Sequence, residues 1–202
     1  LGLVKFGAQW VTLPKRNALR EQAIVTIDQA RRLIRQGRLT EAGIIVKQAV
    51  DDDPKNASAL YLQGLLQFRQ NLLLPARKSF ESVNALVPNH GPTLNNLAVV
   101  QWSLKQTNAA LVSYDQAMLS SPKDPLILNN VAEALNALPP AQRNNATAQR
   151  VGQRFTEQDA DLQKDLEPKG LHRWGATWVS TDQLKQLEAA DQRIKDRLDS
   201  LA

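Results

Sequence analysis

Residues 91–124 read GPTLNNLAVVQWSLKQTNAALVSYDQAMLSSPKD, and residues 57–90 read ASALYLQGLLQFRQNLLLPARKSFESVNALVPNH. The two stretches share small residues, an aromatic residue and a proline at positions 34 residues apart. Residues 23–56 carry the same columns, and a further, degenerate cycle begins at Pro125. A period of this length predicts stacked helix–turn–helix units. In each unit the small residues let two helices approach, and the proline ends the second helix.

Three full cycles occupy every column of this pattern: Ala30, Ala42, Val46, Ala49 and Pro54; Gly64, Ala76, Phe80, Val83 and Pro88; Ala98, Ala110, Tyr114, Ala117 and Pro122. The columns resemble those of the tetratricopeptide repeat (TPR) family over about residues 23–138. The resemblance implies an all-α solenoid of three full repeats and a degenerate fourth. Two features depart from the family pattern. Val46 replaces an aromatic residue, and Gln67 and Gln101 replace bulky residues late in the first helix of their repeats.

A second, shorter duplication stands at the two ends of the chain. Residues 2–12 read GLVKFGAQWVT and residues 170–180 read GLHRWGATWVS. Apolar and polar residues alternate around a Gly-Ala pair, which predicts a short β-hairpin that leads into a helix. We therefore divide the chain into an N-terminal hairpin motif (1–18), a solenoid with a capping helix (19–166), and a C-terminal hairpin motif with an amphipathic helix (167–202). Regular strand is expected only within the two motifs.

The role of these end motifs has two interpretations: they cap the solenoid, or they join subunits. Their expected contact residues are aromatic: Phe6, Trp10, Trp174 and Trp178. Capping predicts that Trp10 packs near Leu19 and Ala23, because a lone hairpin needs local support. At the other end it predicts that Trp178 packs near Phe155 and Leu162. Joining subunits instead predicts exposed rings in a monomer.

The residue composition argues against a catalytic, metal or cofactor site. The chain has no cysteine, its two histidines stand alone, and no phosphate-binding loop or nucleophile motif is present. We therefore expect no enzymatic activity, no metal and no cofactor. The absence of cysteine fits any compartment and leans towards an exported or periplasmic bacterial protein. The chain opens on Leu1 without a methionine, so a signal or anchor could have been removed.

The net charge of +5 is concentrated near the N-terminus, where residues 1–38 hold eight basic and two acidic side chains. This asymmetry fits either a solvated helix face or contact with an acidic partner or an anionic membrane surface. Nucleic acid is disfavoured because aromatic residues do not interleave with the basic run.

Family geometry, taken position by position, implies a concave peptide-binding groove lined by the first helix of each repeat: Tyr61, Leu65, Phe68, Arg69, Asn95, Asn96, Val99, Trp102, Asn129, Asn130 and Glu133. The asparagine pairs are one repeat apart, and an amide can both donate to and accept from a peptide backbone. The predicted function is a non-enzymatic scaffold that binds a peptide or protein of unknown identity. The alternatives are an assembly protein that uses its end motifs, or an accessory domain of a larger complex. We expect a monomer or a weak homo-oligomer.

Overall fold

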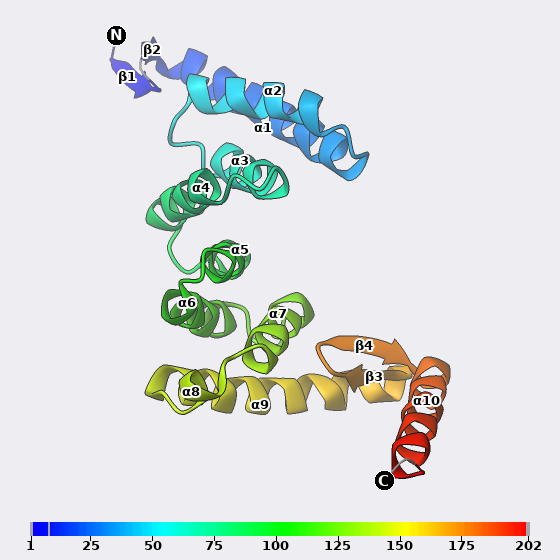
Figure 1. The fold of residues 1–202 in the computed structure, drawn as a ribbon. Helices are drawn as coiled ribbons and strands as arrows, with labels where there is room; N and C mark the ends of the chain where they lie inside the picture. The colour runs from blue at the N-terminus through cyan, green and yellow to red at the C-terminus, as the bar shows by residue number, and fades with distance from the viewer. Residues whose placement is uncertain (1, 8, 201–202) are drawn as a thin grey trace. The chain divides into compact units, whose positions relative to one another are not determined.

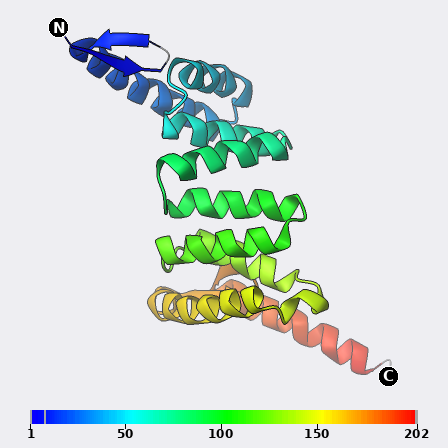
Figure 2. The ribbon, with the colours of Figure 1, turned by 90° about the vertical axis from the view of Figure 1, so that its left-hand side faces the viewer.

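The computed structural model describes residues 2–7 and 9–200 and divides the chain into two compact units, Leu1–Ser113 and Tyr114–Ala202. In the first unit, the hairpin β1 (Leu3–Phe6) and β2 (Gln9–Thr12) leads into α1 (Leu13–Arg35), and α2 (Leu39–Asp52) follows. Next come α3 (Ala57–Arg69), α4 (Leu73–Leu86) and α5 (Gly91–Ser103). Figure 1 shows α1–α2 and α3–α4 as helical hairpins, and Figure 2 shows the strand pair beside α1.

The second unit contains the rest of α6 (Thr107–Ser120), which begins in the first unit, and then α7 (Pro125–Asn136). A short helix α8 (Pro140–Arg143) precedes the long helix α9 (Ala146–Leu166). A 3-10 turn at Glu167–Lys169 leads to the hairpin β3 (Leu171–Trp174) and β4 (Thr177–Ser180) and then to α10 (Thr181–Asp199). The all-α solenoid with two short hairpins is therefore confirmed, and the described strands lie only within the two end motifs.

The 34-residue period also appears in the backbone, at the end of the first helix of each full repeat. Gly37, Asn71 and Lys105 all have positive φ, between 58° and 76°. Each sits in a Schellman turn with the same two hydrogen bonds, such as Lys105 N to the Trp102 carbonyl and Gln106 N to the Gln101 carbonyl. Identical turns keep the second helix of each repeat in the same register.

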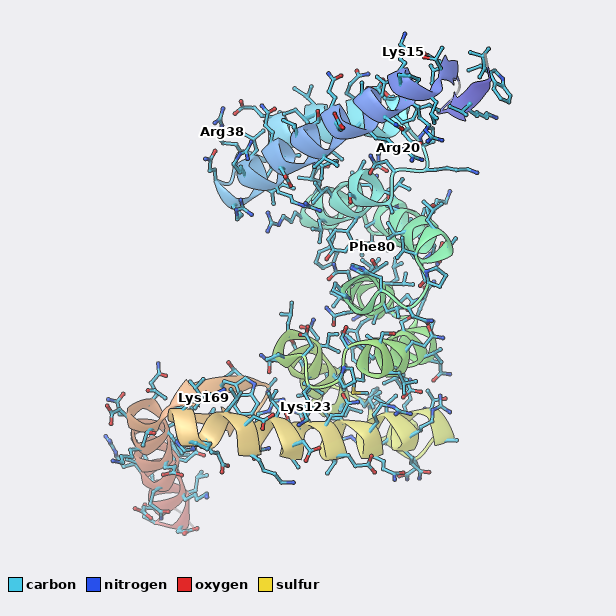
Figure 3. All side chains as sticks on the ribbon, turned by 180° about the vertical axis from the view of Figure 1, so that it is seen from behind. Lys15, Arg20, Arg38, Phe80, Lys123 and Lys169 are labelled. Carbon is cyan, nitrogen blue, oxygen red and sulfur yellow. The ribbon has the colours of Figure 1, made fainter. Side chains whose placement is uncertain are left out.

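The small and aromatic columns meet in the core of the first unit. Phe80 is fully buried beside Gly64, and a Cβ added to Gly64 would lie 2.8 Å from the Phe80 ring (Figure 3). Tyr61 meets the same ring edge-on, with 5.8 Å between the ring centroids. Glycine is therefore needed at this position because the aromatic ring fills the space of the missing side chain.

The glutamines that depart from the family pattern have matched partners one helix away. Ser79 Oγ donates to Gln67 Oε1 at 2.8 Å, and Ser113 Oγ donates to Gln101 Oε1 at the same distance. Both serines are buried. A repeated hydrogen bond therefore replaces apolar contact at these positions and satisfies the buried polar groups.

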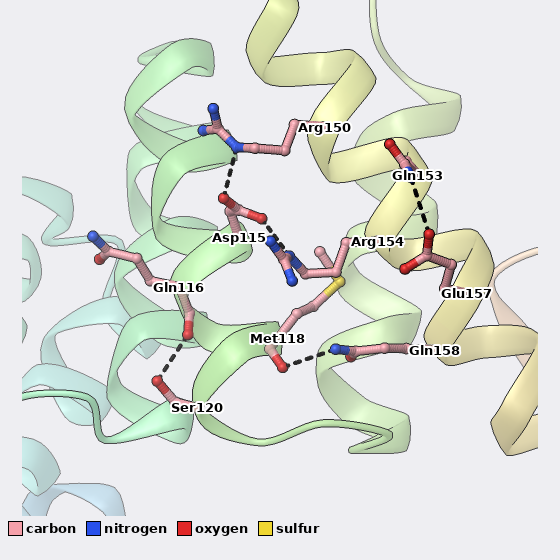
Figure 4. A network of polar contacts seen from close by, with 9 residues as sticks. All are labelled: Asp115, Gln116, Met118, Ser120, Arg150, Gln153, Arg154, Glu157 and Gln158. Carbon is pink, nitrogen blue, oxygen red and sulfur yellow. Dashed lines mark hydrogen bonds and ion pairs between the residues drawn. The ribbon is translucent and has the colours of Figure 1, made fainter.

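The fourth repeat is completed by α9, which packs on α7 and is tied to α6 by an ion-pair network (Figure 4). Asp115 is 7% exposed and accepts from Arg150 Nε at 2.9 Å and from Arg154 Nε at 2.7 Å. Gln158 Nε2 adds a bond to the Met118 carbonyl at 3.1 Å. These contacts give α9 the second-helix role in the degenerate repeat, although the helix is polar along much of its length.

Candidate functional site

Helices α3 and α5 of the first unit carry eight of the eleven predicted groove residues. Tyr61, Leu65 and Phe68 on α3 are half-buried, as are Asn96, Val99 and Trp102 on α5, while Arg69 is exposed. We call this set, together with the α1 residues that line the pocket described next, the first-helix face. Half-buried apolar and aromatic side chains of this kind leave contact area available for a ligand.

A pocket of about 310 Å³ lies at the α1 end of this face. Its apolar lining comes from Ile24 and Ile27 of α1 and from Phe6 of the hairpin, and its basic lining comes from Arg20 and Arg31. Ile24 is 63% exposed, which is unusual for an isoleucine beside a well-packed repeat. Arg31 bonds Asp28 at 2.9 Å. The pocket therefore combines an apolar surface with two arginines and the carboxylate of Asp53. Phe6 lies outside the predicted groove because its contribution requires the hairpin to fold back on α1.

Tyr61 links this pocket to the helices that follow. Its hydroxyl accepts a hydrogen bond from Asn96 Nδ2 at 2.9 Å, and its ring is edge-on to His90 at 6.0 Å. Burial raises the pKa of Tyr61, while the hydrogen bond from Asn96 and the charge of Arg31 oppose that rise. Asn96 is thus engaged with the neighbouring helix through one of its amide N–H groups.

The asparagine ladder is not reproduced as predicted. Asn95 is only 2% exposed, so the prediction that it lines an open groove is wrong; the helix turns it into the core beside Leu94. Asn130 is half-buried and already has a partner, whereas Glu133 in the same helix is exposed. Asn129 accepts a hydrogen bond from Arg173 of strand β3 and so is committed within the second unit.

Arg173 holds the C-terminal hairpin on α9 by charge and by ring contacts. Its guanidinium pairs with both carboxylate oxygens of Asp159, and the two side chains are 10% and 7% exposed. The same guanidinium lies 4.8 Å from the Trp178 ring centroid and 5.7 Å from that of Phe155. Trp178 is therefore half-buried and shares Arg173 with Phe155, and Leu162 on the same helix is buried.

The N-terminal hairpin docks differently, and the prediction from capping that Trp10 packs near Leu19 and Ala23 is wrong. Trp10 is 66% exposed, and Phe6 instead lines a pocket with Leu19 and Ala23. The physical reason is strand register. Lys5 pairs with Trp10 while Phe6 pairs with Gln9, and successive residues of a strand point to opposite faces, so Phe6 and Trp10 cannot contact the same helix.

The turns of the two hairpins also differ in their surroundings. Gly7 has φ +56°, and a Cβ at this position would overlap the carbonyl oxygen of Asp52 at the end of α2. Gly175 has φ +57° and has nothing within 4 Å of such an atom. The first hairpin therefore contacts the end of α2 through its turn and α1 through the face that carries Phe6. The second hairpin is instead attached to α9 through Arg173. Ala8, the other predicted bend residue, lies outside the described residues.

Trp178→Ala is expected to lower the free energy of unfolding by about 1–2 kcal/mol, because it removes a half-buried ring that stacks on a buried cation. Trp10→Ala is the matched variant at the duplicated position. It should change stability by less than about 0.5 kcal/mol because its indole is mostly in solvent. Thermal unfolding of both variants provides the measurement. Equal losses would contradict the different docking of the two hairpins.

The only two tyrosines in the sequence provide a second measurable prediction. Burial raises the pKa of Tyr114 strongly, with a further rise from Glu133, and it raises that of Tyr61 as described. The neutral phenols therefore stabilise the folded state, and this stabilisation is complete below the ordinary pKa of about 10. The stabilisation is lost as pH rises through the raised pKa values. Tyrosinate absorbance should appear at higher pH in the folded chain than in the urea-denatured chain. Coincident titrations would contradict the burial of these phenols.

Two kinds of site are absent from residues 2–7 and 9–200. In this part of the chain, no three His, Cys, Asp or Glu side chains are grouped so that they could hold a metal ion. No helix described here has the length and apolar character needed to cross a membrane.

Comparison with known proteins places the fold. No family model matches the chain. A curated relative, Hsp70-Hsp90 organizing protein 1 of Glycine max, is 22% identical over 171 residues, which cover 84% of this chain and 29% of that protein. The chain thus spans under a third of that relative's length.

Solved structures agree with the repeat assignment. The crystal structure of MamA matches with a TM-score of 0.59 and 16% identity, over 73% of this chain and 84% of that one. The second TPR domain of human RPAP3, in complex with the HSP70 peptide SGPTIEEVD, matches with a TM-score of 0.52 and 15% identity, over 57% of this chain and 96% of that one. At these identities the likeness establishes the fold alone: the chain has the tetratricopeptide-repeat fold, with a β-hairpin added at each end.

Proposed function

We propose that this chain is a non-enzymatic scaffold that binds a peptide or an extended segment of a partner protein on the first-helix face of its first unit. The observation that carries the proposal is the pocket formed by Phe6, Ile24 and Ile27 with Arg20 and Arg31 at its edge. An apolar side chain of the ligand would fill the pocket, and an acidic side chain or terminal carboxylate would pair with an arginine. The half-buried aromatic residues of α3 and α5 extend the contact surface along the ligand.

Two observations support this reading. The RPAP3 domain with the same fold holds a peptide that contains both apolar and acidic residues, Ile, Glu, Glu, Val and Asp. Two of the eight basic side chains of residues 1–38, Arg20 and Arg31, line the pocket. The acidic partner expected from the charge asymmetry is thus proposed to be an acidic peptide segment.

Selection of random displayed peptides on the whole chain tests the proposal. We expect enriched sequences to combine an apolar residue with one or more acidic residues, and their binding to weaken at least tenfold in Ile24→Asp, since that change puts a like charge beside the ligand carboxylate. Ile44→Asp is the matched control. Ile44 is 68% exposed on α2, lies outside the lining of the pocket, and should leave binding unchanged. Enrichment of peptides that bind both variants equally would overturn the proposed site.

A further inference from the structure

The C-terminal helix α10 has an apolar stripe that the described residues do not cover. The helix spans 19 residues, none of which is buried, and its main contacts are with strands β3 and β4. Leu184 and Leu187, next to the hairpin, are half-buried. Farther along the helix, Ile194 is 59% exposed and Leu198 is 62% exposed.

Because the two end motifs are duplicates, the stripe on α10 can be compared with the corresponding positions of α1. Placing Gly170 on Gly2 aligns α10 with α1, because each helix starts directly after its hairpin. The inward positions of α1 then align with the stripe: Leu19 with Leu187, Ala23 with Asp191, Thr26 with Ile194 and Ala30 with Leu198. In α1 these positions are half-buried or buried, and Ala30 is fully buried where α2 packs antiparallel on α1. The same positions in α10 therefore have the spacing of a helix–helix contact without the second helix.

We propose that a second copy of this chain supplies that helix, so that α10 pairs antiparallel with α10 of the partner. The stripe repeats as Leu184, Leu187, Asp191, Ile194 and Leu198, with alternating steps of three and four residues that suit pairing of two helices. A symmetric pair places Leu187 of each chain opposite the partner's Leu198. Each contact then occurs twice, as a twofold axis requires.

Charge decides between the two possible orientations. A parallel pair would set the two Asp191 carboxylates against each other in the centre of the contact, where like charges are desolvated and repel. The antiparallel pair instead sets each Asp191 opposite the partner's Ile194, so the two carboxylates no longer face each other. It also brings Glu188 opposite the partner's Lys195 on the flank of the stripe, again twice. The opposed helix dipoles favour the same orientation.

The length of the stripe sets the strength of the association. A helix of this length extends about 28 Å, which gives fewer than three heptads of contact. Such a contact supports a weak dimer that depends on protein concentration. This self-association is independent of the peptide-binding face, because none of its residues line the pocket of the first unit.

Sedimentation of the whole chain over a concentration series tests the inference. We expect a monomer–dimer equilibrium in the wild type and at least tenfold weaker association in Leu198→Asp. Ile44→Asp, which alters an equally exposed isoleucine on α2, should dimerise as the wild type does. The thermal unfolding of Leu198→Asp should be unchanged because the side chain is exposed, and the same peptide should bind it normally.

The absence of cysteine allows a direct test of orientation. With Glu188→Cys and Lys195→Cys in one chain, oxidation should give a covalent dimer, whereas either substitution alone should not. The two positions are seven residues apart, about 10 Å along a helix, so a disulfide within one chain cannot form. A wild type that stays monomeric at every concentration would overturn the inference. So would a dimer that survives Leu198→Asp, or one that fails to crosslink through the paired cysteines.

Discussion

Replacing Asp159 with alanine is expected to destabilise the second unit by about 3–5 kcal/mol, because Arg173 would remain buried without its counter-ion. Arg173 is 10% exposed, and its other hydrogen-bond partner, Asn129, is neutral. Urea unfolding gives the measurement; in a background with Trp10→Phe and Trp102→Phe, the fluorescence comes from Trp174 and Trp178 of this unit. The C-terminal hairpin should detach first, since strand β3 carries Arg173.

Two further variants separate the buried pair from ordinary surface effects. Asp165 lies on α9, as Asp159 does, and forms an exposed ion pair with Lys123. Asp165→Ala should therefore change the stability by less than about 0.5 kcal/mol. The combination Asp159→Leu with Arg173→Met replaces both charges by apolar groups and should recover most of the loss. A small effect of Asp159→Ala alone would show that the hairpin does not depend on the ion pair.

Phe80→Ala is expected to destabilise the first unit by about 3–5 kcal/mol, which is the cost of removing a fully buried aromatic ring and leaving a cavity. The ring contacts Gly64 and Tyr61, so its loss also loosens the first-helix face. Urea unfolding gives the measurement; in a background with Trp10, Trp174 and Trp178 replaced by phenylalanine, the fluorescence comes from Trp102. Leu86→Ala, which alters a 39% exposed residue of the same helix, is the control and should have a much smaller effect.

A double-mutant cycle isolates the contact between the small residue and the ring. Gly64→Ala alone places a methyl group 2.8 Å from the ring and should be destabilising through overpacking. Repeat one uses Ala30 with Val46 at the corresponding positions, and both are buried. Gly64→Ala together with Phe80→Val should therefore cost less than the sum of the single changes. Additive losses would contradict direct complementarity between the two columns.

The sequence predicted the repeat and its packing because both are encoded locally. Proline, small and aromatic columns at a fixed spacing determine where helices end and where they touch, and in the structure the small and aromatic columns meet in the Gly64–Phe80 contact. The two hairpins were visible for the same reason, since each is a continuous segment with alternating residues.

Contacts between distant segments could not be predicted in this way. Arg173 reaches Asp159 because β3 packs on α9, and its side chain also reaches Asn129 of α7. No local sequence pattern predicts these contacts. The burial of Asn95 likewise depends on the rotation of α5 about its axis. The wrong prediction for Trp10 has a different cause. Both aromatic residues of the hairpin were identified, but the strand register, which places Phe6 and Trp10 on opposite faces, was not considered.

The Schellman turns at Gly37, Asn71 and Lys105 have a consequence for how this chain can be lengthened. Each turn is closed by a hydrogen bond that spans a set number of residues, such as Arg38 N to the Leu33 carbonyl, so it accepts neither an added nor a deleted residue. Between α7 and α9, the described backbone has no positive-φ turn, and the short helix α8 occupies the connection. Extra sequence is therefore expected to be tolerated at residues 139–144, before the Asn145 side chain that caps α9. A reporter or an epitope grafted there would not shift the phase of the preceding repeats.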